Sequence, residues 1–149
     1  MRPLAPCVAL ALALFACGVE QYRQRAPAPD LSIRLVAAEG ADSELVPRLD
    51  GGDAVAVART AVVGAEHIVH VRLLHAADGQ RVLVLDLDAT GRDRLREAST
   101  GHAGERVAIV AGGRVVAAPT IRNELADAEI FVAVPRAIVG RAFDAMTVR

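Results

Sequence analysis

The sequence predicts an α+β fold in which about two helices pack on one face of an antiparallel sheet. Short runs of alternating apolar and polar residues are typical of strands that bury one face. Glycine-containing turns separate neighbouring runs closely enough for hairpins. Two segments carry helical signals, one in the middle of the chain and one near its end. Together these patterns favour a sheet covered by helices, built around one core.

The first half of the chain contains the less regular strands. Residues 31–37 alternate apolar and polar side chains and predict a half-buried strand. Residues 43–49 are compatible with a strand or a loop, because Pro47 interrupts them. A strong turn signal follows, and residues 54–58 predict a short strand. Residues 68–76 predict a surface or edge strand with one clearly apolar face.

The clearest elements lie between Arg81 and Thr120. A tight turn at Asp78-Gly79 leads into Arg81–Leu87, a mostly buried strand. Thr90 and Asp93 resemble a capping box, in which the threonine hydroxyl accepts a hydrogen bond from the backbone N–H of Asp93. The sequence therefore predicts a helix from Thr90 to about Ser99, ended by two glycines.

A hairpin is predicted directly after this helix. Val107–Ala111 and residues 114–118 are apolar runs separated by Gly112-Gly113. Two glycines suit a two-residue hairpin turn, because the favoured turn types need positive φ. Pro119 is expected to end the pairing, since proline has no N–H to donate.

The last part of the chain predicts one more strand and the second helix. Residues 120–126 form a short helix or a loop, and residues 129–134 a strand rich in apolar side chains. Residues 136–146 show apolar side chains at helical spacing, with Pro135 at the start. The residues with this spacing are Ile138, Val139, Ala142, Phe143 and Met146.

The N-terminus is expected to lie outside the fold. Residues 1–16 combine an arginine with a short apolar run and resemble a bacterial lipoprotein signal peptide. Such a signal implies that Cys17 becomes the first mature residue and carries the lipid. Residues 17–30 are polar and contain proline, so they predict a flexible tether. The remaining residues, 31–149, form the single domain.

Two alternatives stay open for this segment. Phe15 is unusual within a lipoprotein signal, and an ordinary cleaved signal peptide or a retained anchor would also fit. Cys7 and Cys17 are the two cysteines, and a disulfide between them is the second alternative. The lipid accounts better for the lone mature cysteine, because an unpaired thiol in an exported protein otherwise needs a partner.

Composition limits the classes of function. The chain has 149 residues, enough for one domain, and a net charge of -1, which gives no indication of a nucleic-acid surface. Aromatic residues make up 3%, so the core must consist of valine, leucine, isoleucine and alanine. A chain of this size buries roughly two-thirds of its unfolded surface, so the domain needs no disulfide.

The order of motifs between residues 54 and 146 resembles the periplasmic head domain of the SecD/SecDF protein-export family. The segment Val63 to Ile68 is similar to the sequence motif that leads into this domain in the family. The later positions that match are Leu87, Asp88, Gly91, Leu95, Thr100, Ala108, Ile109, Val110, Gly113, Val115, Val116, Ala118, Pro119 and Ile121. Ala111-Gly112 departs from a Leu-Asp pair in the family, and the family's C-terminal motif is blurred in residues 130–142.

This resemblance implies a ferredoxin-like sandwich and a structural role for its signature residues. Asp88, Gly91, Gly113 and Pro119 are then expected to define the fold and not to catalyse a reaction. In the family, the head region is thought to contact preproteins that emerge in the periplasm, while transmembrane segments couple export to proton flow. This chain is expected to lack those segments, so the resemblance implies an isolated head-like module.

The residues themselves give no catalytic or metal site. Asp86 and Asp88 could pair as carboxylates, but Asp88 is expected to cap the helix and Asp86 to face an arginine. His70 and His75 point to opposite faces of a strand, so a zinc site is not expected. No nucleophile elbow or phosphate-binding loop occurs. We expect no catalytic residues, no metal and no cofactor.

The expected function is therefore non-enzymatic. We expect an envelope lipoprotein, anchored to the membrane by its N-terminal lipid, that binds extended or unfolded polypeptide and assists protein export. Strand addition at the edge formed by Val69, Val71 and Leu73 is the expected mode of binding. The alternatives are a docking module of a cell-envelope complex and a small hydrolase with an unrecognised site. Gly18 after Cys17 weakly favours the outer membrane in a bacterium with two membranes.

Overall fold

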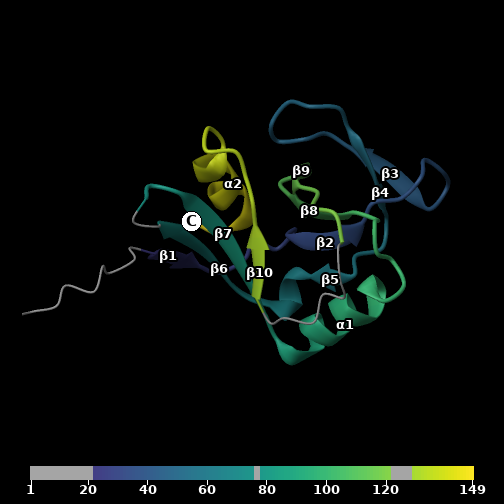
Figure 1. Cartoon of the computed structure of the whole chain (residues 1–149), viewed down its shortest axis with the longest axis horizontal. Helices are drawn as coiled ribbons and strands as arrows, with labels where there is room; N and C mark the ends of the chain where they lie inside the picture. Colours follow the sequence, from purple (N-terminus) through teal and green to yellow (C-terminus); the bar gives the residue numbers. More distant parts are fainter. Residues whose placement is uncertain (1–21, 76–77, 122–128) are drawn as a thin grey trace, which may run out of the picture.

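The structure is a computed structural model that describes residues 22–75, 78–121 and 129–149. The predicted signal peptide and Cys17 lie outside these described residues, as does most of the predicted helix or loop at 120–126. The α+β fold class is confirmed, with antiparallel sheets and two α-helices (Figure 1). In the described residues no helix combines the length and the apolar character that crossing a bilayer requires.

The strands divide between two four-stranded sheets and a separate hairpin. The first sheet has the order β1-β6-β7-β10, and its strands are Tyr22–Arg25, Ile68–His75, Arg81–Leu87 and Glu129–Val132. The second sheet has the order β5-β2-β8-β9, and its strands are Val63–Gly64, Ser32–Leu35, Val107–Ala111 and Arg114–Ala117. The hairpin consists of β3, Ser43–Val46, and β4, Val55–Ala58.

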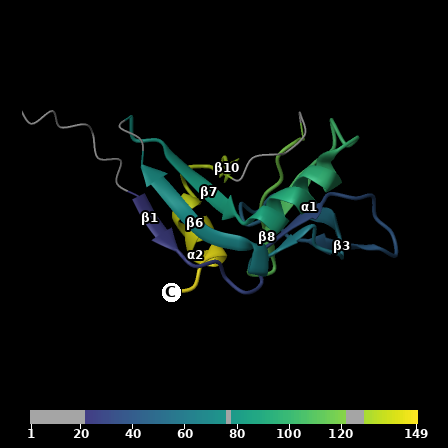
Figure 2. The ribbon, with the colours of Figure 1, turned by 90° about the horizontal axis from the view of Figure 1, so that it is seen from below.

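The two α-helices lie in different places. Helix α2, Val139–Met146, packs on one face of the first sheet against β6 and β7, and in Figure 2 it lies behind these strands. Helix α1, Ala89–Ser99, follows β7 directly and contacts β5 of the second sheet. A 3-10 turn, Ala65–His67, connects β5 to β6. Helix α1 also contacts β7, so it bridges the two sheets, whereas α2 packs mainly on the first sheet.

One apolar core connects both sheets and both helices. Its fully buried side chains include Ile33 and Ile109 of the second sheet, Leu85 of the first, Leu95 of α1 and Met146 of α2. A smaller core lies between the β3–β4 hairpin and the second sheet, where Val57 of the hairpin is completely buried. Apart from Phe143 of α2, the side chains of both cores are aliphatic or methionine, as the low aromatic content predicts.

The hairpin prediction is confirmed, but Pro119 does not end the pairing. Gly112 and Gly113 have φ of 60° and 69°, and Ala111 pairs with Arg114. The regular strand ends at Ala117, yet the carbonyl of Pro119 accepts the N–H of Val107 at 3.0 Å. An isolated bridge then joins Arg106 to Thr120. Proline removes only its own N–H, so its carbonyl remains free to pair.

The prediction of a flexible tether up to residue 30 is wrong for the described part of that segment. Tyr22–Arg25 forms β1, which pairs antiparallel with β6. Pro27 forms a bridge to Thr147, and the N–H of Ala28 donates to the carbonyl of Met146 at 2.8 Å. The folded unit therefore begins no later than Tyr22, and its first strand lies beside the C-terminal end of the chain (Figure 1).

Candidate functional site

The predicted peptide-binding edge is wrong, because β6 is an inner strand. It lies between β1 and β7, and β1 pairs with residues Val71 to Leu74. The side chains of Val71 and Leu73 are 0% and 4% exposed and belong to the main core. Val69 is 48% exposed, but it is the single member of the predicted edge on the surface. Val71 and Leu73 are core residues and cannot contact a ligand without unfolding the sheet.

The open edges of the described sheets differ in character. β1 carries Arg23 and Arg25, and charged side chains on an edge disfavour pairing with another strand. β9 is partly covered, because Val115 exchanges backbone hydrogen bonds of 2.9 Å with Pro47 and Leu49. Among the described residues, none pairs with the outer edge of β10, whose sequence is Glu-Ile-Phe-Val. This makes β10 an apolar edge at which a further strand could be added.

Side chains of β10 alternate between the core and the surface. Val132 is buried and Ile130 packs partly against the main core, whereas Phe131 points outward with 62% of its surface exposed. Phe131 pairs with Val84 of β7, which is itself completely buried. An aromatic side chain of this exposure, on an edge left open by residues 22–75, 78–121 and 129–149, is an apolar surface that a polypeptide could cover.

A hollow of about 290 Å³ lies beside this edge. Its described wall comes from β2, α1, β8, the segment after β9, and β10. The lining residues are Ile33, Leu95, Val107, Ile109, Pro119, Thr120, Ile121, Glu129, Ile130 and Phe131. Most of these side chains are apolar, so the hollow suits an apolar side chain. Pro119, predicted as a structural signature, is part of this wall.

An ion-pair ladder holds β10 to its neighbours. The guanidinium of Arg72 on β6 donates two hydrogen bonds of 2.7 Å to Asp86 on β7 and one of 2.7 Å to Glu129 on β10. Asp86 therefore faces an arginine, as the sequence predicts. The hydrogen bonding of Arg72 to Asp86 is the main reason that the pKa of Arg72 is raised above its ordinary value. Glu129 thus fixes the beginning of β10 in the sheet.

Asp88 caps helix α1, which confirms its expected structural role. Its Oδ1 accepts the N–H of Gly91 at 2.7 Å, and its Oδ2 lies 3.0 Å from Nδ1 of His67. The bond from Gly91, followed by that from His67, lowers the pKa of the Asp88 carboxyl. The predicted capping box at Thr90 is wrong, because the helix begins two residues after Leu87 and Thr90 already lies within it.

The carboxylates of Asp86 and Asp88 have different partners. Asp86 is held by Arg72, and Asp88 is held by a helix N-terminus and a histidine. His102 similarly lies 2.6 Å from a carboxylate oxygen of Glu105. Within the described ranges, no group of three or more His, Cys, Asp or Glu side chains could hold a metal ion.

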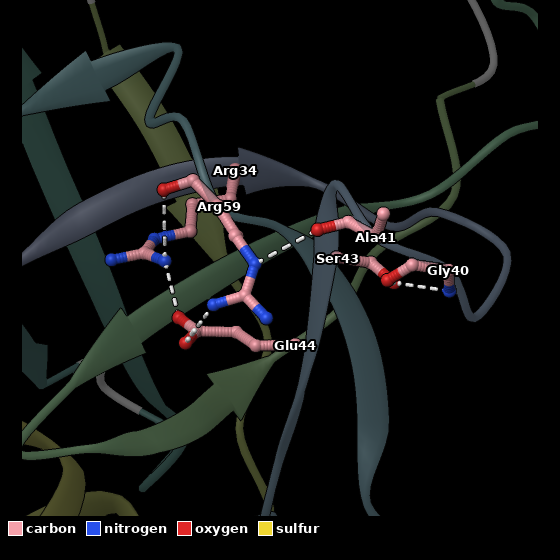
Figure 3. Close-up of polar contacts among 6 residues, drawn as sticks. All are labelled: Arg34, Gly40, Ala41, Ser43, Glu44 and Arg59. Atoms are coloured by element: carbon pink, nitrogen blue, oxygen red, sulfur yellow. Dashed lines mark hydrogen bonds and ion pairs between the residues drawn. The ribbon is translucent and has the colours of Figure 1, made fainter.

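A second polar cluster links β2 to the β3–β4 hairpin (Figure 3). The Nη1 of Arg34 donates to Glu44 at 2.7 Å and to the carbonyl of Arg59 at 3.3 Å. Nε of Arg59 donates to the carbonyl of Ala41 at 3.2 Å, and its Nη1 lies 3.9 Å from Glu44. Ser43 exchanges hydrogen bonds with the backbone of Gly40. These hydrogen bonds connect β2 to the segments on both sides of the hairpin, so the cluster orients the hairpin.

Sequence reasoning missed Phe131, although a signal for it exists. Ile130 and Val132 alternate with Phe131, so a strand that buries the first two must expose the aromatic ring. The local sequence does not predict that β10 lies at the edge of the described sheet, because this position depends on how the other strands pair.

Comparison with known proteins gives a consistent result. The family model described as "SecDF, P1 head subdomain" matches residues 43–133. No curated protein matches the chain. A solved structure titled "Structure and function of a membrane component SecDF that enhances protein export" is similar with a TM-score of 0.53 and 18% identity, over 83% of this chain and 64% of that one.

A second similar structure is titled "Crystal structure of SecDF in Super-membrane-facing form". It has a TM-score of 0.55 and 17% identity, over 78% of this chain and 17% of that one. At these identities the two structures support the fold. The chain spans less than two thirds of the length of either.

Proposed function

Because this chain belongs to the SecDF P1 head subdomain family, we propose that it binds extended polypeptide at the edge of β10 and assists protein export. It does so without catalysis, as a module anchored to the cell envelope by a lipid on Cys17 and facing the periplasm. The observation that carries the proposal is the exposed Phe131 beside an apolar hollow, on a strand edge with which no described residue pairs. The reported role of a similar SecDF protein in export supports the assignment of the process.

Strand addition gives the proposed mode of binding a physical basis. An extended segment paired with β10 would satisfy the backbone groups of that edge. Its side chains would alternate in direction, so that every second one points toward the hollow. Backbone pairing tolerates many sequences, while the hollow of about 290 Å³ selects for apolar side chains. This combination suits a partner that is unfolded and apolar, as a polypeptide in transit is.

The substitution Phe131→Asp tests this site. Burial of a phenylalanine side chain contributes about 1.5–3 kcal/mol, so we expect binding to weaken about 10-fold or more. Fluorescence anisotropy of a labelled, permanently unfolded protein measures the affinity for the chain from residue 18 onward. Every described helix and strand, and both cores, lie within this fragment.

The matched control is Leu45→Asp on β3. Leu45 is 58% exposed, close to the 62% of Phe131, but it lies on the hairpin away from the hollow. Equal affinities of the two variants would show that β10 is not the site. If the unmodified chain does not bind unfolded protein, and crosslinking in the envelope captures one folded complex, the docking-module alternative is correct.

A further inference from the structure

The chain enters its fold at one end of the first sheet. Tyr22, the first described residue, pairs with Leu74 near the end of β6, and His75 pairs with Arg81 at the start of β7. Four residues, 18–21, separate Tyr22 from Cys17. At about 3.6 Å per residue, Tyr22 lies within about 18 Å of Cys17. If Cys17 carries the proposed lipid, this end of the sheet is held close to the bilayer.

A hollow of about 420 Å³ lies at the same end. It is lined by Arg81 at the start of β7 and by Arg136, in the segment that connects β10 to α2. Val82 and Val134 form apolar parts of the wall, and Phe131 borders it. Both arginines are exposed, so their guanidinium groups are accessible to a ligand.

The charges at this hollow do not cancel. Within the part of the chain that the structure describes, no carboxylate forms an ion pair with Arg81 or Arg136. Asp78 is the acidic residue in the wall, and its Oδ1 accepts the N–H of Gln80 at 2.9 Å. The two arginines thus outnumber the one carboxylate.

This local charge contrasts with the charge of the whole molecule. The complete chain has a net charge of -1 and residues 1–17 contribute one arginine, so the remainder has a net charge of -2. A protein of this charge is repelled by an anionic surface unless it presents a basic region to it. The two arginines lie where the anchor would orient the molecule toward the membrane.

We propose that Arg81 and Arg136, with the apolar wall between them, form a contact surface for the anionic phospholipid headgroups of the bilayer. This proposal rests on the proposed lipid anchor for its orientation, but the contact itself depends only on the folded domain. Guanidinium groups bind phosphate through paired N–H donors. Apolar side chains such as Val82 and Val134 suit the interfacial region behind the headgroups. The surface would hold the domain in one orientation on the membrane.

Vesicle flotation of the non-lipidated chain from residue 18 onward tests the contact. We expect binding to vesicles that contain phosphatidylglycerol and none to vesicles of phosphatidylcholine alone, and we expect high salt to abolish it. Each arginine near an anionic surface contributes about fivefold to binding, so R81Q/R136Q should weaken it about 25-fold.

The double variant R94Q/R114Q is the control. Arg94 on α1 and Arg114 on β9 are also exposed, and their replacement changes the net charge by the same amount. The control should bind within about twofold of the unmodified chain. Equal losses in both double variants, or no preference for anionic vesicles, would overturn the proposal.

Two further measurements separate this proposal from the proposed function. R81Q/R136Q should retain its affinity for unfolded protein, whereas Phe131→Asp should weaken that affinity about 10-fold or more. Mass spectrometry of the full chain expressed in a bacterium reports whether Cys17 is lipidated. Selective binding that depends on Arg81 and Arg136 supports the contact surface even without the lipid. A lipidated Cys17 without that selectivity would support the anchor and refute the surface.

Discussion

Two glycines in α-helices illustrate how a single atom determines the effect of a substitution. A Cβ at Gly91 in α1 would lie 2.9 Å from the backbone carbonyl of His67 and 3.0 Å from its Cβ. A Cβ at Gly140 in α2 would meet nothing within 4 Å. Gly91 is therefore needed so that α1 can approach the turn before β6, while Gly140 is not needed for packing.

We expect Gly91→Ala and Gly140→Ala to change stability in opposite directions. Overpacking against His67 should lower the free energy of unfolding of Gly91→Ala by about 1–3 kcal/mol. Gly140→Ala should raise it by about 0.4–1 kcal/mol, because alanine restricts the unfolded chain. Urea denaturation followed by circular dichroism measures both values. A Gly91→Ala variant as stable as Gly140→Ala would contradict the contact between α1 and the turn.

Among the secondary-structure elements, the longest uniform patterns were predicted best. The strands Arg81–Leu87 and Val107–Ala111 have the predicted bounds. Both consist largely of successive apolar residues, a pattern that predicts a strand buried on one or both faces. Helix α2 begins at Val139, three residues later than expected, since the segment after Pro135 first forms a turn. The class of each element follows from local pattern, but its ends depend on neighbouring contacts.

Strand β1 could not be predicted from the local sequence pattern. Its sequence, Tyr-Arg-Gln-Arg, has no apolar alternation, and it is a strand because tertiary contacts hold it. Arg25 donates to Asp144 at 3.0 Å and its guanidinium lies 5.0 Å from the ring centre of Phe143. Missing this strand led directly to the wrong site, because β6 is an edge only if β1 is absent. A functional edge can therefore be predicted only after every strand is known.

Removal of β1 tests whether it belongs to the folded unit. A chain that begins at Pro27 loses the pairing with β6 and the contacts of Arg25. At about 1 kcal/mol for each backbone hydrogen bond, the free energy of unfolding should fall by a few kcal/mol relative to the chain from residue 18. Thermal or urea denaturation of the two fragments gives this difference. Equal stabilities would restore the interpretation of this segment as a tether.

For the molecule as a whole, the shared core predicts a single unfolding transition. Leu85 of the first sheet and Ile109 of the second belong to one apolar cluster with both helices. Neither sheet can lose its packing without exposing the other, so we expect the calorimetric and van't Hoff enthalpies to agree within about 10%. Differential scanning calorimetry of the chain from residue 18 measures both. Two separate transitions would indicate that the sheets are independent domains.

The C-terminal end of the fold lies beside its first strand, β1. The N–H of Val148 donates to the carbonyl of Ala26 at 3.1 Å, four residues from the start of β1. In Figure 2 the C-terminus lies beside the same strand. A unit whose ends lie within one strand length of each other can be inserted into a loop of a larger host. Because β1 separates Tyr22 from the C-terminal end by about 13 Å, we expect a short linker between the two ends to give a circular permutant that folds.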